Sequence, residues 1–435
     1  MMGLFKNIRH RAICSWLLAI TLGWAPIGAS SKETDKKLVI TSPLKALFDE
    51  SWQRQPEARS YSIRLESFQA RERVTQSFLP KPLTMELAGK AERSSTSTNF
   101  GAGGTGEYIV GFAIPLWLIG ERSSAIALSN AESQRLIKQQ AIIQLRLAAR
   151  LRSLFWEFEL AKINHELAEN RYQNAKSLSQ DVLRRYKAGD LSKADLFQAE
   201  SAFANAEATL AEGQANLILA KQNLRSVIGR EITPDLLKPT KQYAEVLPAL
   251  PKNFVDLDQS HPVIQDLIAQ VEVASKATAL AQAQTRQNPE LQLYTTGGRP
   301  EVGAPTQQSI MLGFKIPFGS GDRVQAQKFA SQANQIESEE RLVFERERVL
   351  AELDAAKARV ESAQIRLTAA KRRAQLSAET REFFDKSFKF GESDLPTRLR
   401  IELEAVDATK QAAQAEIAYL ASVSALRQAL GLLPE

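Results

Sequence analysis

Few side chains in this sequence have a type and spacing that could bind a metal or carry out catalysis. Beyond the first thirty residues there are two histidines, His165 and His261, and each stands alone without a second ligand at metal-binding spacing. The single cysteine, Cys14, excludes disulfides and cysteine metal sites. We therefore expect both histidines to lie on the surface or to pack between helices.

Sequence motifs of the common enzyme classes are also missing. The chain has no HExxH zinc motif, no GxxxxGKS/T phosphate loop, no GxSxG nucleophile motif and no GxGxxG dinucleotide motif. Glycines cluster at residues 101–104, but they precede a predicted strand rather than a helix, so we interpret the segment as a loop. Most carboxylates lie on amphipathic helical segments, where solvation explains them. The sequence predicts no catalytic residue, no cofactor, no metal site and no enzyme.

The most informative pattern is a short glycine-containing segment that occurs twice. Residues 185–195 read RYKAGDLSKAD, and residues 387–394 read SFKFGESD. Gly391 follows Gly189 by 391 − 189 = 202 residues. Two further pairs of segments share this offset, namely 111–115 with 313–317 and 224–229 with 426–431. One offset at three separate places indicates an internal duplication.

The composition favours long helices over an ordinary globular core. Of 435 residues, 44% are hydrophobic, 24% are charged and only 7% are aromatic, while alanine is abundant. The net charge of +6 is spread along helical segments beside acidic residues, so it indicates solvated helix faces and predicts no nucleic-acid partner.

Residues 1–30 have the pattern of a secretory signal peptide. Basic residues at 6, 9 and 11 precede an apolar stretch at 13–24, and small residues follow at 28–30. The stretch is too short for a comfortable membrane helix. Cys14 lies before most of the apolar stretch, which is the wrong place for lipid attachment. We therefore predict an exported chain.

Two predicted strands, one at residues 107–118 and one at residues 310–318, have apolar residues at every second position. Each has an upstream companion, at 83–88 and 291–296, so the sequence predicts two strand hairpins. A membrane strand needs this alternation because lipid meets one face only, but a strand of a soluble sandwich shows it too. The candidate membrane-facing residues are Tyr108, Val110, Phe112, Ile114 and Leu116, and in the second copy Ile310, Leu312, Phe314, Ile316 and Phe318.

The helical segments are unusually long. Residues 123–187 contain no proline or glycine, which predicts a helix of roughly 100 Å. After Gly189, leucine or phenylalanine recurs every seven residues from Leu196 to Leu224, with small residues three positions later. Such a heptad predicts supercoiled packing with close helix approach. Gly189 and Gly391 occupy positions that end a helix, because glycine adopts positive φ most easily.

The N-terminal caps of the returning helices have two candidates in each copy. Ser192 or Asp190 is expected to cap the first returning helix, and Ser393 or Asp394 the second. Each copy is therefore a long helical hairpin attached to a strand hairpin. We predict a signal peptide at 1–30, a first repeat at 31–229, a proline-rich connector at 230–260 and a second repeat at 261–435.

Four strands cannot close a membrane barrel, because the smallest bacterial barrels have eight strands and open edges are not tolerated in lipid. Here the sequence resembles the outer-membrane efflux proteins, the TolC family. The resemblance covers residues 41–433 and rests on the duplicated plan, the two tip segments, the GFxIP segments and the closing LRxVIG segment.

The resemblance implies a mainly α-helical protein with a small membrane β part. Family members form a homotrimer in which a twelve-stranded outer-membrane β-barrel, shared by three chains, continues into a periplasmic α-helical barrel. Such a trimer carries substrate passively outward from an inner-membrane pump and a periplasmic adaptor of a Gram-negative bacterium. A faint likeness of residues 313–323, and of His261 before a proline, extends to the subgroup that serves heavy-metal resistance pumps.

The resemblance also implies which residues face the adaptor and form the closed entrance. Asp195 matches an acidic residue that helps to hold the entrance shut. Phe388 and Ser393 replace a tyrosine and an arginine of that lock, and Thr397 and Arg400 replace acids of the entrance, so the latch differs here. The implied tip residues are Tyr186, Lys187, Ala188, Gly189, Leu191, Ser192, Asp195, Phe388, Phe390, Gly391, Ser393, Thr397 and Arg400.

A different class of protein also fits the helical pattern. A soluble periplasmic coiled-coil scaffold or adhesin would place the alternating strands in a soluble sheet, and it would be released without detergent.

Overall fold

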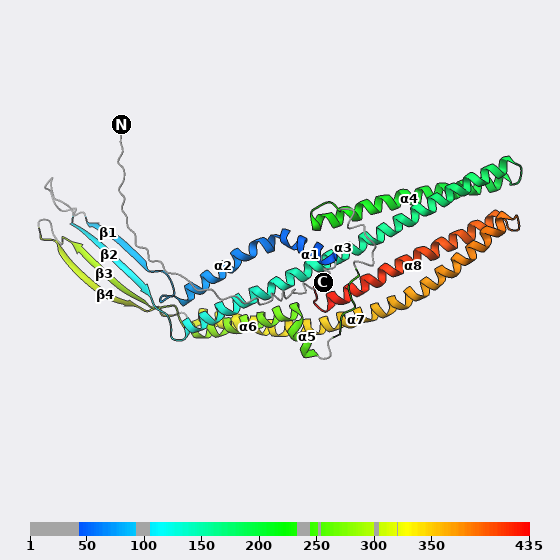
Figure 1. The fold of residues 1–435 in the computed structure, drawn as a ribbon. Helices are drawn as coiled ribbons and strands as arrows, with labels where there is room; N and C mark the ends of the chain where they lie inside the picture. Colours follow the sequence, from blue (N-terminus) through cyan, green and yellow to red (C-terminus); the bar gives the residue numbers. More distant parts are fainter. Residues whose placement is uncertain (1–42, 93–104, 233–243, 251–253, 300–303, 320) are drawn as a thin grey trace, which may run out of the picture. The chain divides into compact units, whose positions relative to one another are not determined.

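A computed structural model describes residues 43–92, 105–232, 244–250, 254–299, 304–319 and 321–435 (Figure 1). The predicted signal peptide, the glycine cluster at 101–104 and parts of the predicted connector lie outside these residues. The described part is mainly helical with one four-stranded sheet. Its elements are α1 (Pro43–Arg54), α2 (Pro56–Gln76), β1 (Thr84–Glu92), β2 (Thr105–Pro115), α3 (Glu121–Lys187), α4 (Lys193–Ile228), α5 (Phe254–Ser260), α6 (Pro262–Ala283), β3 (Glu290–Gly298), β4 (Gln307–Lys315), α7 (Gly321–Lys389) and α8 (Leu395–Ala429).

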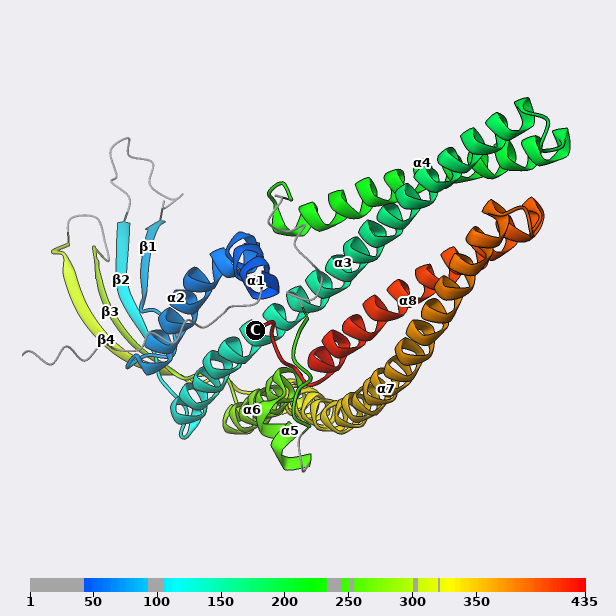
Figure 2. The same cartoon turned by 45° about the vertical axis from the view of Figure 1, so that its right-hand side comes forward.

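The two halves of the chain follow the same plan. In the first half the hairpin β1–β2 leads into α3, a helix of 67 residues, and the chain returns along α4. In the second half the hairpin β3–β4 leads into α7, a helix of 69 residues, and the chain returns along α8. Figure 2 shows α4 alongside the distal half of α3, and α8 alongside that of α7. The predicted long helices and four strands are thus confirmed.

The four strands form one antiparallel sheet in the order β1-β2-β3-β4. Phe112 lies opposite Met85 on one side and Leu293 on the other, and Leu293 lies opposite Leu312. Directly paired residues share a face, so these four large apolar side chains, one from each strand, lie on one face of the sheet.

Three residues that were predicted to lie in strands fall just beyond the strand ends. Leu116 follows the end of β2 at Pro115, and Ile316 and Phe318 follow the end of β4 at Lys315. Proline has no N–H to donate, so Pro115 and Pro317 limit the ladder at these points.

The predicted heptad seam of α4 faces α3. Ala199, Ala206 and Ala220 are buried, and the Cβ of an alanine at position 213 would lie 3.4 Å from the Cα of His165. Small residues therefore allow the close approach that the heptad predicts, and His165 packs between helices as expected. Along the described residues, none of the helices combines the length and the apolar character that a bilayer span requires.

Candidate functional site

The turns of the two helical hairpins, called here the first tip (residues 182–199) and the second tip (residues 385–400), have the same backbone geometry. Gly189 has φ 86° and Gly391 has φ 77°. In the first tip the amides of Gly189 and Asp190 donate to the carbonyls of Tyr186 and Arg185, at 3.0 and 2.9 Å. The amides of Gly391 and Glu392 make the equivalent bonds to Phe388 and Ser387. Both tips are Schellman motifs, in which glycine supplies the left-handed residue.

The returning helices begin with side-chain caps that differ between the tips. Ser192 and Asp195 form a capping box: the Asp195 amide donates to the Ser192 hydroxyl at 3.2 Å, and the Ser192 amide donates to the Asp195 carboxylate at 3.0 Å. At the second tip the Thr397 amide donates to Asp394 at 3.3 Å, and hydrogen bonding by the Thr397 side chain, followed by that of its amide, lowers the pKa of the Asp394 carboxyl. Of the four candidate caps, Ser192 and Asp394 take the role.

The two tips share one apolar cluster. Phe388 of α7 is 2% exposed and packs with Val182 of α3 and Leu196 of α4. Its ring lies between two guanidinium groups, with the Cζ atoms of Arg185 and Arg398 each 4.8 Å from the ring centroid. Both distances are within the range of cation–π attraction.

The other tip residues are mostly exposed. Tyr186 and Phe390 are 36% and 81% exposed, and Arg400 pairs with Glu404 of its own helix at 3.5 Å. Ser393 is half-buried beside the cap of α8. Lys187 and Ala188 are exposed, and Leu191 is half-buried beside the shared cluster.

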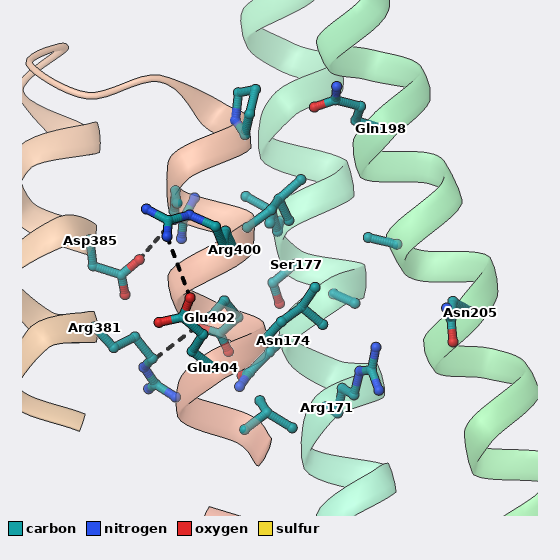
Figure 3. A pocket seen from close by; sticks show the side chains of 18 of the residues that line it. Arg171, Asn174, Ser177, Gln198, Asn205, Arg381, Asp385, Arg400, Glu402 and Glu404 are labelled. Carbon is teal, nitrogen blue, oxygen red and sulfur yellow. Dashed lines mark hydrogen bonds and ion pairs between the residues drawn. The ribbon is translucent and has the colours of Figure 1, made fainter. Parts of the chain in front are cut away.

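A groove of about 1170 Å³ lies between the two hairpins next to the tips (Figure 3). Four helices line it with charged and amide side chains. Figure 3 shows Arg381 of α7 and Glu402 of α8, which pair at 3.5 Å, on the opposite side of the groove from Gln198 and Asn205 of α4. This groove was not predicted from the sequence.

The sheet has one apolar face that no described element covers. Among the candidate membrane-facing residues, Tyr108, Phe112, Ile310, Leu312 and Phe314 are between 38% and 80% exposed. Val110 and Ile114 are half-buried on the same face. Met85, Leu87 and Leu293 extend this face over β1 and β3, with 44% to 69% exposure.

The opposite face of the sheet carries polar contacts. The Tyr294 hydroxyl donates to Glu86 at 2.8 Å, and the Lys315 ammonium donates to Glu290 at 3.2 Å. Thr296 and Ser309 hydrogen-bond to each other at 2.5 Å. One face is therefore suited to an apolar environment and the other to water.

One buried carboxylate ties the sheet to the helices of both halves. Glu121, at the start of α3, is 3% exposed. It accepts hydrogen bonds from the Leu118 amide at 3.0 Å, from Gln284 at 2.8 Å and from Asn288 at 2.6 Å. Gln284 and Asn288 flank the connection from α6 into β3, so Glu121 fixes both strand–helix junctions together.

A second buried charge cluster ties the connector to the helices. Glu245 accepts two bonds from Arg152 of α3, at 3.0 and 2.6 Å, and lies 3.3 Å from Arg427 of α8. All three side chains are less than 5% exposed. Sequence reasoning missed this cluster because Glu245 lies in a segment without regular structure and its partners are far away along the chain.

The comparisons with known proteins agree with this geometry. Residues 47–230 match the profile of the family described as outer membrane efflux protein. The crystal structure of CusC has a TM-score of 0.75 at 16% identity, covering 89% of this chain and 92% of that one. No curated protein sequence shows significant similarity to the chain.

Two further structures of outer-membrane proteins have the same fold. VceC of Vibrio cholerae has a TM-score of 0.68 at 19% identity, covering 91% of this chain and 97% of that one. The open state of the MtrE channel of Neisseria gonorrhoeae has a TM-score of 0.72 at 17% identity, covering 90% and 89%. The fold is therefore that of outer-membrane channel proteins. The chain thus shares this fold, and over residues 47–230 also the sequence pattern, of the outer membrane efflux proteins.

Proposed function

We propose that the chain is the outer-membrane exit duct of a tripartite efflux system in a Gram-negative bacterium. The observation that carries this proposal is the four-stranded sheet, which has one exposed apolar face, one polar face and two edges, β1 and β4, that no described strand pairs. Open edges are not tolerated in lipid. Three copies that join β1 to β4 would close a barrel of twelve strands, with the apolar face toward lipid and the polar face toward the lumen.

The long helices support the same assembly. Apolar residues with seven-residue spacing remain exposed on α7, namely Phe329, Ile336 and Val343, and nearer the tip Leu376 and Phe383, with Phe390 one residue beyond the end of the helix. An apolar stripe with heptad spacing is stabilised by packing against another helix. In this chain α8 packs against a different stripe of α7, which contains Val349, Leu353 and Ala356. We propose that a second copy of the chain covers the exposed stripe, so that three copies form the α-helical barrel.

The tips are proposed to face a periplasmic adaptor and an inner-membrane pump. Their exposed side chains, among them Tyr186, Lys187 and Phe390, are accessible to a partner. Cargo moves passively through such a duct, so the duct requires neither a catalytic group nor a cofactor. The proposed domain organisation is a signal peptide at 1–30, repeats at 31–229 and 261–435, and a connector at 230–260.

Membrane fractionation tests the assembly. The mature protein should sediment with outer membranes and should run as a trimer after detergent extraction. Release as a monomer without detergent would contradict the proposal and favour the soluble scaffold.

Deletion of the gene tests export. The deleted strain should become more sensitive to at least one compound in a panel of toxic metals, dyes and antibiotics. The identity of that compound indicates the class of cargo. A metal would fit the resemblance to the heavy-metal subgroup.

Substitution of a tip glycine tests the docking assignment. Gly189→Pro and Gly391→Pro should abolish efflux while trimers still reach the outer membrane, because proline cannot adopt φ near +80°. Asp190→Ala, at an exposed position that contributes only its backbone, is the control. Normal resistance in both proline variants would refute the tip assignment.

A further inference from the structure

The strands of the two halves of the chain meet in one pair, β2 with β3, whose register is defined. Ala113 of β2 lies opposite Gln292 of β3. The pairing continues beyond the end of β2, because the amide of Leu116 donates to the carbonyl of Pro289 at 2.8 Å. The sheet thus contains one complete junction between the halves, and it has two edges, β1 and β4, that no described strand pairs.

The internal duplication relates each strand of the first half to one strand of the second half. Strand β2 corresponds to β4 with the offset found in the sequence, since 315 − 113 = 202. Thr84 pairs with Ala113, and Glu290 pairs with Lys315, so β1 corresponds to β3 with an offset of 290 − 84 = 206. The prolines that begin α2 and α6 have the same offset, 262 − 56 = 206. The correspondence is therefore fixed for each helix and the strand that follows it.

The two offsets give the register in which β4 would pair with β1 of a second copy, called here the intercopy strand pair. Residue 113 corresponds to 113 + 202 = 315, and residue 292 corresponds to 292 − 206 = 86. Lys315 of one copy therefore lies opposite Glu86 of the next. Opposite charges that face each other on neighbouring strands stabilise the pair.

The register is specific, because a different one loses this attraction. A shift by two residues is the smallest that keeps the apolar side chains of both strands on one face. Such a shift would place Ala88 or Thr84 opposite Lys315, and neither carries a charge.

The charged side chains of the intercopy strand pair lie on the polar face of the sheet. Within one copy, Lys315 donates to Glu290 at 3.2 Å, and Glu86 accepts from Tyr294 at 2.8 Å. The predicted register joins these two bonds into one row, in which Glu290 and Lys315 of one copy are followed by Glu86 and Tyr294 of the next. Lys315 then lies between two carboxylates.

The same register brings apolar residues together on the other face. Across the intercopy strand pair, the opposed residues are Phe314 with Leu87, Ile316 with Met85 and Phe318 with Leu83. All six are between 37% and 86% exposed in one copy. Ile316 and Phe318 lie beyond the last residue of β4, and a strand from a second copy accounts for the continuation of the apolar alternation there.

The helices point to the same arrangement. In one chain α6 packs between α3 and α7, and Arg135 of α3 bonds to Asp266 and Gln270 of α6 at 3.3 and 2.9 Å. The corresponding helix α2 packs along α3, and none of its residues is buried. The correspondence places α7 of a second copy against the free side of α2. The exposed stripe of α7 that contains Phe329 and Ile336 is available for this contact.

We propose that the contact between two copies repeats the junction between the two halves of one chain, with Lys315 of β4 opposite Glu86 of β1 in the next copy. The row of charges and the apolar pairs behind it make this edge complementary to a second copy of the same chain. The proposal rests on the proposed function, because it specifies how the copies of the duct join.

Disulfide cross-linking tests the register. The only native cysteine lies in the predicted signal peptide, so the double variant Lys315→Cys, Glu86→Cys introduces the only thiols of the mature chain. Directly opposed residues of neighbouring strands have Cα atoms about 5 Å apart, which suits a disulfide. Within one copy the two positions are three strand spacings apart, or roughly 14 Å, which is too far. Oxidation in isolated outer membranes should therefore give covalent trimers that survive boiling in detergent and dissociate on reduction.

Two matched pairs report the shifted registers. Lys315→Cys combined with Ala88→Cys, or with Thr84→Cys, should give several-fold less covalent trimer than the pair with Glu86→Cys. Efficient cross-linking of a shifted pair, with none at position 86, would show that the register is wrong. If wild type is trimeric in detergent and none of the three pairs cross-links, the intercopy strand pair is refuted while the duct stands. A wild type that is only monomeric contradicts the proposed function itself.

Charge reversal tests the ion pair separately. The background variant Glu290→Gln removes the partner of Lys315 within its own copy. In this background, Lys315→Glu and Glu86→Lys should each lower the temperature at which the trimer dissociates on a detergent gel, and the double reversal should recover most of the loss. Single reversals that leave the dissociation temperature unchanged would contradict an ion pair between the copies.

Discussion

The hydroxyl of Tyr294 on β3 donates a 2.8 Å hydrogen bond to the carboxylate of Glu86 on β1, across the strand that lies between them. The residue of β2 that pairs with both is Gly111. A Cβ at position 111 would overlap the Tyr294 ring. The glycine of the first GFxIP segment is therefore the residue that lets this bond cross β2.

Gly111→Ala should displace the Tyr294 ring and break its bond to Glu86. We expect a cost of about 1–3 kcal/mol, which is typical of overpacking, and a lower thermal midpoint of the assembled protein. Gly313→Ala is the matched control, because it occupies the equivalent position 202 residues later and its new Cβ would lie 3.7 Å from Gln292. Equal midpoints for the two variants would show that the Tyr294 ring does not depend on position 111.

Asp195→Ala should fray the start of α4 without a wider effect. The variant loses the carboxylate that accepts the Ser192 amide at 3.0 Å, so we expect a cost of about 1 kcal/mol and faster amide exchange over residues 193–197. Asp195→Glu, which retains a capping-box acceptor, should recover most of the protection. A leaking entrance together with unchanged exchange would instead assign Asp195 to a contact between chains.

Glu245→Gln should be the most destabilising of these changes. The variant leaves Arg152 buried without a counter-charge and leaves Arg427 paired only with the exposed Glu435; breaking a buried ion pair typically costs about 3–5 kcal/mol. Chemical unfolding of the purified protein measures the loss. Glu337→Gln removes an exposed partner of Arg341, and it should change stability by no more than about 0.5 kcal/mol.

His261 should make the folded state sensitive to mild acid. The ring is buried, its Nδ1 has no hydrogen-bond partner, and burial lowers the pKa below its ordinary value of 6.5 despite a bond to the Ala429 carbonyl. The unfolded chain then binds a proton at a higher pH than the folded chain does. The stabilisation is therefore present above pH 6.5 and is lost as the pH falls from 6.5 toward the lowered pKa.

Unfolding experiments between about pH 8 and pH 5 measure this dependence, since an unperturbed histidine titrates within that range. His261→Gln should flatten the curve over this interval. A wild-type protein whose stability does not change over the interval would refute the role of His261.

The parts of the fold that local sequence determines were predictable. A run without proline or glycine predicted α3. Gly189 and Gly391 predicted the ends of α3 and α7, and both have positive φ in the structure. Alternation of apolar residues predicted the strands, because residues two apart in a strand lie on the same face whichever strand pairs with it. The strand ends were less predictable: the apolar pattern continues to Leu116 and Phe318, but the hydrogen-bond ladder does not.

The contacts between distant segments were not predictable from one sequence. Phe388 was identified as a tip residue, but its enclosure by Arg185, about two hundred residues earlier, depends on how two hairpins pack. Capping of α4 also shows the difference. Asp190 and Ser192 both have a suitable side-chain oxygen, and only the extended backbone at Ser192 decides which of them caps the helix.

The hydrogen bonds of Glu121 have a mechanical consequence. This one carboxylate joins the last residues before α3 to the segment that leads from α6 into β3, and the amide of Leu116 reinforces the joint by donating to the carbonyl of Pro289 at 2.8 Å. A rotation of the helices is therefore transmitted to the strands, because the junction between the helices and the sheet is rigid and does not act as a hinge.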